Sequence, residues 1–330
     1  MNWTAYEVIL RLETPLHIGW RRVGNLWQTR PYILPHQLLA ALAARCAEWD
    51  VGGNEDGSPN PYVQKLEWLR KRMRFSYFFP TLERDPQGCY LPYYDERGNL
   101  KWKCGKCEPP ELSELSAEEF DYLFLDAVMR TAIDHDRSAV QEGQLFAFEY
   151  VRPRCREWPG GAEGKEVYFG GYVFLSEELS KELKKQVSAE ESLARLLDRL
   201  QVGGERKYGW GLIRVSEKDL RGLPGEKIEL YGRREITVQL ESELYVTVEK
   251  DVGIPAHVLL QGVKDKIAGQ VEVVLMRSTR SEGDKTFYGK EVLGKPCYRP
   301  GSRCKDGSTK FLIDAGEGNS GIWGIWKISG

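Results

Sequence analysis

The chain has 330 residues, a formal net charge of −2 at pH 7 and a hydrophobic fraction of 41%. This length suits about two domains, each with its own hydrophobic core. A mean hydropathy of −0.48, without a long apolar run, excludes a chain built of membrane spans. The near-zero charge excludes a uniformly basic nucleic-acid-binding protein, so such contacts would come from local patches. No secretory signal pattern opens the chain, and we expect it to be cytoplasmic.

The first half of the chain alternates between predicted strands and helices. Apolar residues alternate over residues 6–13 and predict a half-buried strand. Pro35 then opens a helix with an apolar stripe. A stretch rich in Gly, Asn, Ser and Pro begins an insertion at about residues 51–115. The remaining predicted elements are a helix at about 116–130, strands at 145–151 and 167–175, a helix opened by the capping box of Ser188 and Glu191, and a strand at 211–215.

This order of strand, helix, strand, strand, helix, strand is that of a ferredoxin-like (RRM-like) β-α-β-β-α-β unit. We therefore predict an α+β fold, with such a domain over residues 1–221 and the insertion within it. The segment "GLPGEK" at residues 222–227 marks the domain boundary. Short strands prevail over residues 222–330, which predicts a second, mostly β, degenerate ferredoxin-like domain.

The stretch "VGGERKYGWG", residues 202–211, joins the second predicted helix to the next strand and combines glycines, cations and aromatic rings. Glycines adopt positive φ and let backbone N–H groups approach phosphate oxygens. Arg206 and Lys207 add charge attraction, while Tyr208 and Trp210 offer faces on which bases stack. A tight turn would need only one glycine. The composition therefore favours a surface for single-stranded nucleic acid.

Three stretches of the sequence resemble the repeat-associated mysterious protein (RAMP) superfamily, the RNA-binding subunits of CRISPR effector complexes. They are "LETPLHIGWRR" at 12–22, "AIDHDRSAVQEGQLFAFEYV" at 132–151 and "VGGERKYGWGLIRV" at 202–215. The resemblance implies that the first loop and the glycine-rich loop hold RNA. The residues to which it assigns RNA binding are His17, Gly19, Arg21, Arg22, Gly203, Gly204, Arg206, Lys207, Tyr208 and Gly209.

The resemblance also bears on catalysis and on partners. Superfamily members that cut target RNA carry an Asp in the loop after the "HIG" element. Here no Asp or Glu occurs between Trp20 and Glu48, so we expect a non-catalytic subunit. The length and the all-strand second half resemble the type III-D subunit that caps the CRISPR RNA at its 5′ handle. Its implied partners are CRISPR RNA, a large subunit and backbone RAMP subunits of a type III effector, with target RNA reached indirectly. The insertion, at residues 61–110, is expected to act as a thumb that contacts RNA or a neighbouring subunit.

The seven cysteines are an odd number and a poor fit to a closed disulfide framework. Cys104 and Cys107 form a CxxC motif before two prolines, which suits a zinc knuckle better than a thioredoxin-type motif. Cys89 and Cys155 are the candidates to complete the ligand set. A structural zinc ion and unliganded thiols both stay open, because no second CxxC is present.

Two other functions stay open. A metal-independent endoribonuclease that processes repeat RNA would need a general base, for which the candidates are His17, His36, His135 and His257. For each of them a non-catalytic role is favoured, because a base needs a partnered and positioned site. A protein-docking module without RNA contact would instead use exposed aromatic residues in "YFF" and "YLPYY".

Overall fold

The structure is a computed structural model that describes residues 3–49, 60–134, 139–158, 164–185, 187–260, 266–282, 285–313 and 323–329. Within these ranges, side chains are described except at 132–134, 139–144, 277–282 and 285–293. His135, a candidate base, lies outside the described residues. Strands and helices occur together in the described chain, which confirms the α+β class.

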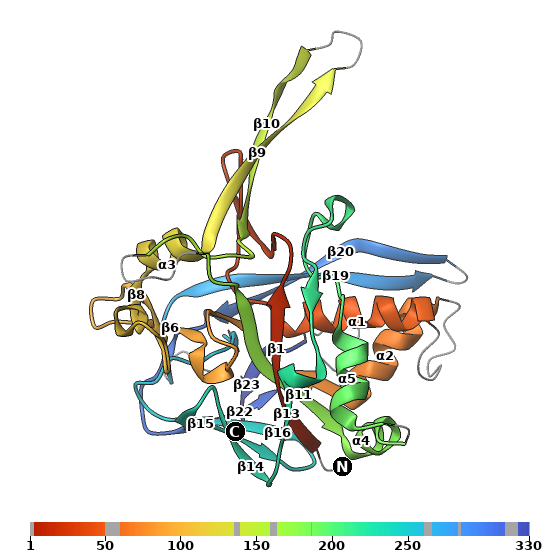
Figure 1. The fold of residues 1–330 in the computed structure, drawn as a ribbon, viewed down its shortest axis with the longest axis vertical. Helices are drawn as coiled ribbons and strands as arrows, with labels where there is room; N and C mark the ends of the chain where they lie inside the picture. The colour runs from red at the N-terminus through yellow and green to blue at the C-terminus, as the bar shows by residue number, and fades with distance from the viewer. Residues whose placement is uncertain are drawn as a thin grey trace.

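A six-stranded antiparallel sheet forms the centre of the N-terminal half (Figure 1). Its strand order is β12-β1-β11-β4, while β13 also pairs with β1 and β5 with β11. Most of β1 is buried on both of its faces, which places this strand in the middle of the core. The strands are β1 (Trp3–Leu12), β4 (Met73–Phe75), β5 (Phe79–Thr81), β11 (Tyr168–Ser176), β12 (Ile213–Arg214) and β13 (Leu220–Leu223).

Two of the helices begin where the sequence predicts. α1 starts at Pro35 and buries Leu38 and Leu42, and each buried leucine stabilises the fold by about 1.5–3 kcal/mol. α5 starts after Ser188, whose hydroxyl accepts a hydrogen bond from the Glu191 N–H at 3.0 Å. No described helix is long and apolar enough to cross a membrane. The described helices are α1 (Pro35–Trp49), α2 (Pro61–Arg72), α3 (Ala117–Phe124), α4 (Glu177–Leu183) and α5 (Ala189–Leu197).

The prediction that residues 145–151 form the second strand of the central sheet is wrong. That position is taken by β4 and β5, which pair with β11. Residues 145–151 belong to β10, which pairs antiparallel with β9 and parallel with β3 in a separate sheet of order β2-β3-β10-β9. An apolar pattern identifies a strand but not its partner. The strands of this sheet are β2 (Gly19–Val23), β3 (Leu26–Thr29), β9 (Leu125–Asp134) and β10 (Ala139–Val151).

The helix predicted at about 116–130 ends early, at Phe124, and the chain continues as β9. Ser116 caps the helix as a Ser at this position should. Beyond it, residues pair with a distant strand, for example Val128 with Phe148. This pairing overrides the local helical propensity. β9 and β10 form a long hairpin that projects from the body of the molecule (Figure 1).

Residues 61–110, which were expected to act as a thumb, pack within the body of the molecule, and their contact with RNA or a neighbouring subunit stays a prediction. The first part of this segment supplies α2, β4 and β5 to the central packing, and the rest forms a three-stranded antiparallel sheet. Trp102 of this sheet stacks on Phe120 of α3 with ring centroids 4.0 Å apart. The strands of the small sheet are β6 (Tyr90–Tyr94), β7 (Leu100–Cys104) and β8 (Glu114–Ser116).

The C-terminal half confirms the mostly β prediction, since its described residues contain strands and no α-helix. An eight-stranded sheet has the order β14-β15-β16-β22-β23-β17-β20-β19, and β18 pairs with β21. Buried apolar residues of both halves form one continuous core. The strands are β14 (Lys227–Leu230), β15 (Arg233–Leu240), β16 (Leu244–Val248), β17 (Val258–Leu259), β18 (Ile267–Ala268), β19 (Val271–Glu282), β20 (Lys285–Tyr298), β21 (Arg303–Cys304), β22 (Thr309–Ile313) and β23 (Trp326–Ile328).

Candidate nucleic-acid interface

The glycine-rich loop lies directly on the first loop. The Gly204 N–H donates a hydrogen bond to the His17 carbonyl at 2.8 Å. A Cβ on Gly203 would lie 2.4 Å from that same carbonyl oxygen, and a Cβ on Gly211 would lie 1.9 Å from the Val202 carbonyl oxygen. Gly203 and Gly211 also have φ values of +84° and +77°. Close approach within the protein's own backbone therefore requires these two glycines.

The same loop turns Arg206, Lys207 and Tyr208 outward, whereas Trp210, which was predicted to offer a second stacking face, is buried. Arg206–Tyr208 forms one 3-10 turn between Glu205 and Gly209, both in the left-handed conformation. Arg206 and Lys207 are exposed, and Tyr208 is 69% exposed. Within the described residues, no hydrogen bond or ion pair engages the side chain of Arg206 or Lys207. The turn thus presents two uncompensated cations beside an open aromatic face.

Arg130 of β9 connects the projecting hairpin to this turn. Its guanidinium carbon lies 4.3 Å from the ring centroid of Tyr208 and 4.9 Å from that of Trp210. It also forms an ion pair with Glu205. Cation–π contacts of this kind contribute about 0.5–1 kcal/mol each at exposed sites. Sequence analysis missed Arg130 because it placed the residue in a helix.

The buried side chain of His17 connects the first loop to β10. Nδ1 of its ring lies 2.7 Å from the Glu149 carbonyl oxygen. Burial lowers the pKa of His17, so the ring is neutral at pH 7 and donates its Nδ1–H to that carbonyl. A Cβ on Gly19 would lie 3.8 Å from His17 Nε2, an ordinary contact. This arrangement fits an ordering role for His17, and an RNA contact by its side chain stays a prediction.

Two further cations lie exposed on β2, at the start of the β2–β3 hairpin. Arg21 lies over the Trp20 ring with its guanidinium carbon 4.1 Å from the centroid, and Arg22 lies 5.2 Å from the Trp27 centroid. Arg21 Nε donates to Gln28 Oε1 at 2.7 Å. Both guanidinium groups are thus held by neighbours yet open to solvent.

A groove of about 500 Å³ runs from the glycine-rich loop along α1. Small side chains of α1 form one wall of the groove, and Gln201, Gly203 and Arg206 line the part contributed by the glycine-rich loop and the residue before it. The lining residues are Gln37, Ala40, Ala41, Ala44, Ala47, Tyr62, Gln201, Gly203 and Arg206. The groove and the outward cations are therefore contiguous.

A buried polar cluster around Glu272 joins the first loop to the C-terminal sheet. Trp20 Nε1 donates to Glu272 Oε2 at 2.6 Å, and Arg30 lies 3.4 Å from Oε1. Arg299 Nε lies 3.5 Å from Oε2, and His257 Nε2 contacts Oε1. The Glu272 side chain is only 10% exposed. Nothing in the sequence signals this cluster, because its members are scattered along the chain.

Ionisation in this cluster follows from its partners. Burial lowers the pKa of His257, so its ring is neutral: Nε2–H donates to Glu272, and Nδ1 accepts from the Tyr77 hydroxyl at 2.9 Å. Burial alone would raise the pKa of Glu272, but the hydrogen bond from His257 and the charges of Arg30 and Arg299 outweigh it and lower the pKa to about 2. Glu272 is therefore ionised at neutral pH.

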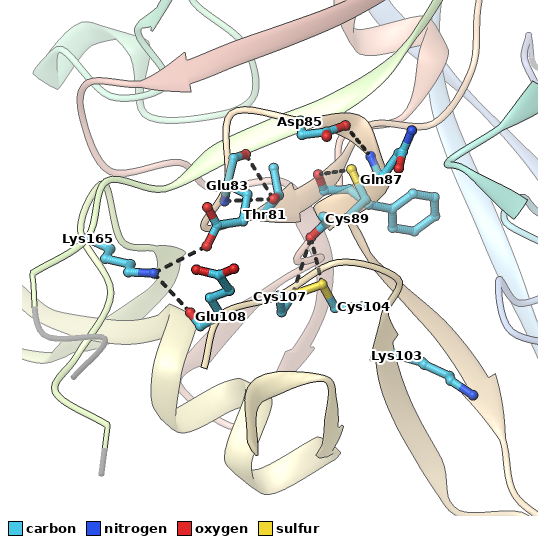
Figure 2. The surroundings of a disulfide bond; sticks show 12 residues. Thr81, Glu83, Asp85, Gln87, Cys89, Lys103, Cys104, Cys107, Glu108 and Lys165 are labelled. Carbon is cyan, nitrogen blue, oxygen red and sulfur yellow. Dashed lines mark hydrogen bonds and ion pairs between the residues drawn. A yellow bond between two sulfur atoms is a disulfide. The ribbon is translucent and has the colours of Figure 1, made fainter. Parts of the chain in front are cut away.

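The cysteines predicted to bind zinc are arranged differently (Figure 2). Cys104 and Cys107 are joined by a disulfide, and Cys89 is a buried thiol 3.5 Å from the Phe79 carbonyl oxygen. Cys155 is also buried and free. In the part of the chain that the structure describes, no group of three or more His, Cys, Asp or Glu residues is placed to hold a metal ion. As arranged, the four cysteines do not fit a zinc ion, and zinc binding stays a prediction.

Comparison with known proteins places the chain in a family. The solved structures similar to it include the type III-B Cmr-beta bound to cognate target RNA and AMPPnP, state 1, at 14% identity and TM-score 0.47 over 90% of this chain and 85% of that chain. Another is the type III-B Cmr-beta bound to cognate target RNA, at 13% identity and TM-score 0.45 over 90% and 86%. No curated protein matches the chain. The family model of the RAMP superfamily matches residues 9–214, more than half of the 330 residues, and the chain therefore belongs to the RAMP superfamily.

Proposed function

We propose that this protein is a non-catalytic subunit of a type III CRISPR effector ribonucleoprotein. It binds the CRISPR RNA at its 5′ repeat handle, as the type III-D cap subunit does, and assembles with the large subunit and the backbone RAMP subunits. Target RNA is reached through the CRISPR RNA. Membership of the RAMP superfamily supports the assignment.

One observation carries the RNA-binding part of the proposal. Arg206 and Lys207 are exposed, are not engaged by any described side chain, and lie on a turn that is flanked by two backbone hydrogen bonds to the first loop, from Gly204 and Gly211. A phosphate backbone supplies the missing anions, and the exposed face of Tyr208 supplies a stacking surface for a base. The contiguous groove along α1 gives the strand a path beyond the turn.

Two features support a subunit that does not cut RNA. The first loop carries no carboxylate between Trp20 and Glu48. His17 and His257 are buried and hydrogen-bonded to protein groups, so neither is placed to take a proton from a ribose hydroxyl.

The proposal also includes the fold of the central sheet, which we take as a ferredoxin-like unit. If β4 and β5 are counted together as its second strand, the order β12-β1-β11-β4 reads 4-1-3-2 in the strand numbering of that unit.

The test is RNA binding by the double variant Arg206→Ala, Lys207→Ala. Each phosphate contact on a single strand contributes about 0.7 to the slope of log affinity against log salt. We expect weaker binding of a repeat-derived RNA and a slope smaller by about 1.4. The matched control is Lys184→Ala, Lys185→Ala, which removes two adjacent exposed cations after α4. Unchanged affinity and slope in the first variant, or equal changes in both, would contradict the proposal.

A further inference from the structure

A second cavity, of about 210 Å³, opens on the other side of β10 from the glycine-rich loop. It lies where the β2–β3 hairpin, α3, the small β6–β7 sheet and residues 299–300 of the C-terminal half meet. Trp102, which stacks on Phe120, gives it a flat wall. Its volume equals that of roughly seven water molecules in the liquid. This is room for one planar base and not for a stack of bases.

Arginine side chains surround this cavity. Arg21 is exposed and lies flat over Trp20, whereas Arg30 is 6% exposed. Arg30 Nη1 donates to the Gly19 carbonyl at 2.9 Å, and Nη2 lies 3.4 Å from Glu272 Oε1. Arg299, whose Nε lies 3.5 Å from Glu272 Oε2, also lines the cavity. The guanidinium groups at the cavity wall suit a ligand that carries acceptor atoms.

Two carboxyl groups face the same space. Glu149 Oε2 accepts from the Thr29 N–H at 2.8 Å, and its Oε1 has no hydrogen bond within the described part of the chain. Asp121, an exposed residue of α3, also lines the cavity. Desolvation, then the charge of Glu149, raises the pKa of Asp121. The oxygens of Glu149 and Asp121 offer acceptors to a ligand with N–H donors.

The geometry points to one nucleobase class, and we propose that the cavity binds a single unstacked guanine of the RNA. Guanine presents two adjacent donors, N1–H and N2–H, to a carboxylate such as Glu149, and acceptors, O6 and N7, to Arg30. Adenine and cytosine have one amino donor beside a ring nitrogen that is an acceptor. Uracil has one N–H donor between two carbonyl oxygens. Each of these three bases would therefore place an acceptor against the carboxylate. Unstacked bases in RNA are read in this way, on their edges and against aromatic or guanidinium planes. This inference rests on the proposed function.

The experiment measures binding of short RNAs to the full-length protein. One set of oligouridine octamers carries a single guanosine at each position in turn, and a second set carries adenosine instead. We expect guanosine to bind roughly tenfold tighter than adenosine at one position, the discrimination typical of a bidentate base contact. Glu149→Gln keeps the acceptor for Thr29 and is expected to abolish this preference. Glu157→Gln, an exposed residue outside the cavity wall, should leave it intact.

The outcomes separate this inference from the proposed function. A guanosine preference that is lost in Glu149→Gln, while the plain oligouridine still binds that variant, supports the cavity. Equal affinity for every octamer contradicts guanine binding in the cavity and leaves the proposed function unaffected. A guanosine preference that persists in Glu149→Gln also contradicts guanine binding in the cavity. Failure of all octamers to bind overturns both.

Discussion

Replacing Glu272 by Gln tests how the two halves of the protein are held together. The substitution keeps the size and polarity of the side chain but removes its charge. Arg30 and Arg299 then remain in the same buried region without their counter-charge. Removing one partner of a buried charge network lowers the free energy of unfolding strongly, because the remaining charges stay desolvated. Replacing the whole network by apolar residues would change it far less.

The magnitude follows from the ionisation of Glu272. Its pKa falls from 4.5 to about 2 in the folded protein. Each unit of pKa difference corresponds to about 1.36 kcal/mol, so the ionised carboxylate stabilises the folded state by at most about 3 kcal/mol at neutral pH, because His257 is neutral there and adds a hydrogen bond but no charge. We expect the free energy of unfolding of Glu272→Gln to be lower than that of the parent protein by about this amount. The exposed Glu229→Gln is the matched control and is expected to change it by less than about 0.5 kcal/mol.

The pH dependence sharpens the test. Because folding depresses the pKa of Glu272, its stabilisation is complete above about pH 4.5 and is lost as the pH falls toward about 2. His257 stays neutral in the folded protein, since burial lowers its pKa, whereas the unfolded ring takes up a proton as the pH falls toward 6.5. This loss of stability is common to the parent and Glu272→Gln and cancels in their difference. Urea unfolding followed by tryptophan fluorescence should show a constant difference between parent and Glu272→Gln between about pH 8 and pH 6.5. Equal stabilities at pH 7, or a difference that grows as the pH falls from 8 to 6.5, would refute the reasoning.

Two further predictions concern the glycine-rich loop and the cysteines. Gly211→Ala should lower the midpoint of thermal unfolding more than Gly209→Ala does. A Cβ at residue 211 would lie 1.9 Å from the Val202 carbonyl oxygen, whereas the space around Gly209 is open. Equal losses in the two variants would show that positive φ alone matters. The protein is unfolded without reductant in the presence of a chelator, and its thiols are then titrated. We expect five reactive thiols, because Cys104 and Cys107 are paired. Seven thiols and released zinc would establish the zinc site instead.

Local patterns in the sequence were sufficient for elements whose stability is decided locally. Pro35 and Ser188 start helices where the capping rules place them, and the alternation at residues 6–13 is a strand. The pairing of strands was not predictable in the same way. Residues 145–151 and the short strands β4 and β5 are all mostly apolar and extended, and only the packing of distant segments decides which of them lies beside β11.

The candidate site divides along the same line. The exposure of Arg206 and Lys207 was predictable, because charged side chains are rarely buried without a partner. The two aromatic residues of the loop could not be told apart in the sequence, although Tyr208 is 69% exposed and Trp210 is buried. The groups that orient the site were not predictable from the sequence. Arg130 and Glu205 are 75 residues apart, and Trp20 and Glu272 are 252 apart. No spacing rule connects such positions until the fold is known.

The Glu272 cluster and the second cavity share side chains, and this links stability to ligand binding. Arg30 and Arg299 pair with Glu272 and also line the cavity, and Trp20 donates to the same carboxylate. The ion pairs therefore fix the guanidinium groups in the positions from which they would meet a base. Losing the Glu272 charge should free both guanidiniums to turn toward the cavity carboxyls, so Glu272→Gln should weaken the guanosine preference as well as the fold. The Arg206 and Lys207 contacts share no partner with this cluster, so the binding of plain oligouridine should change far less.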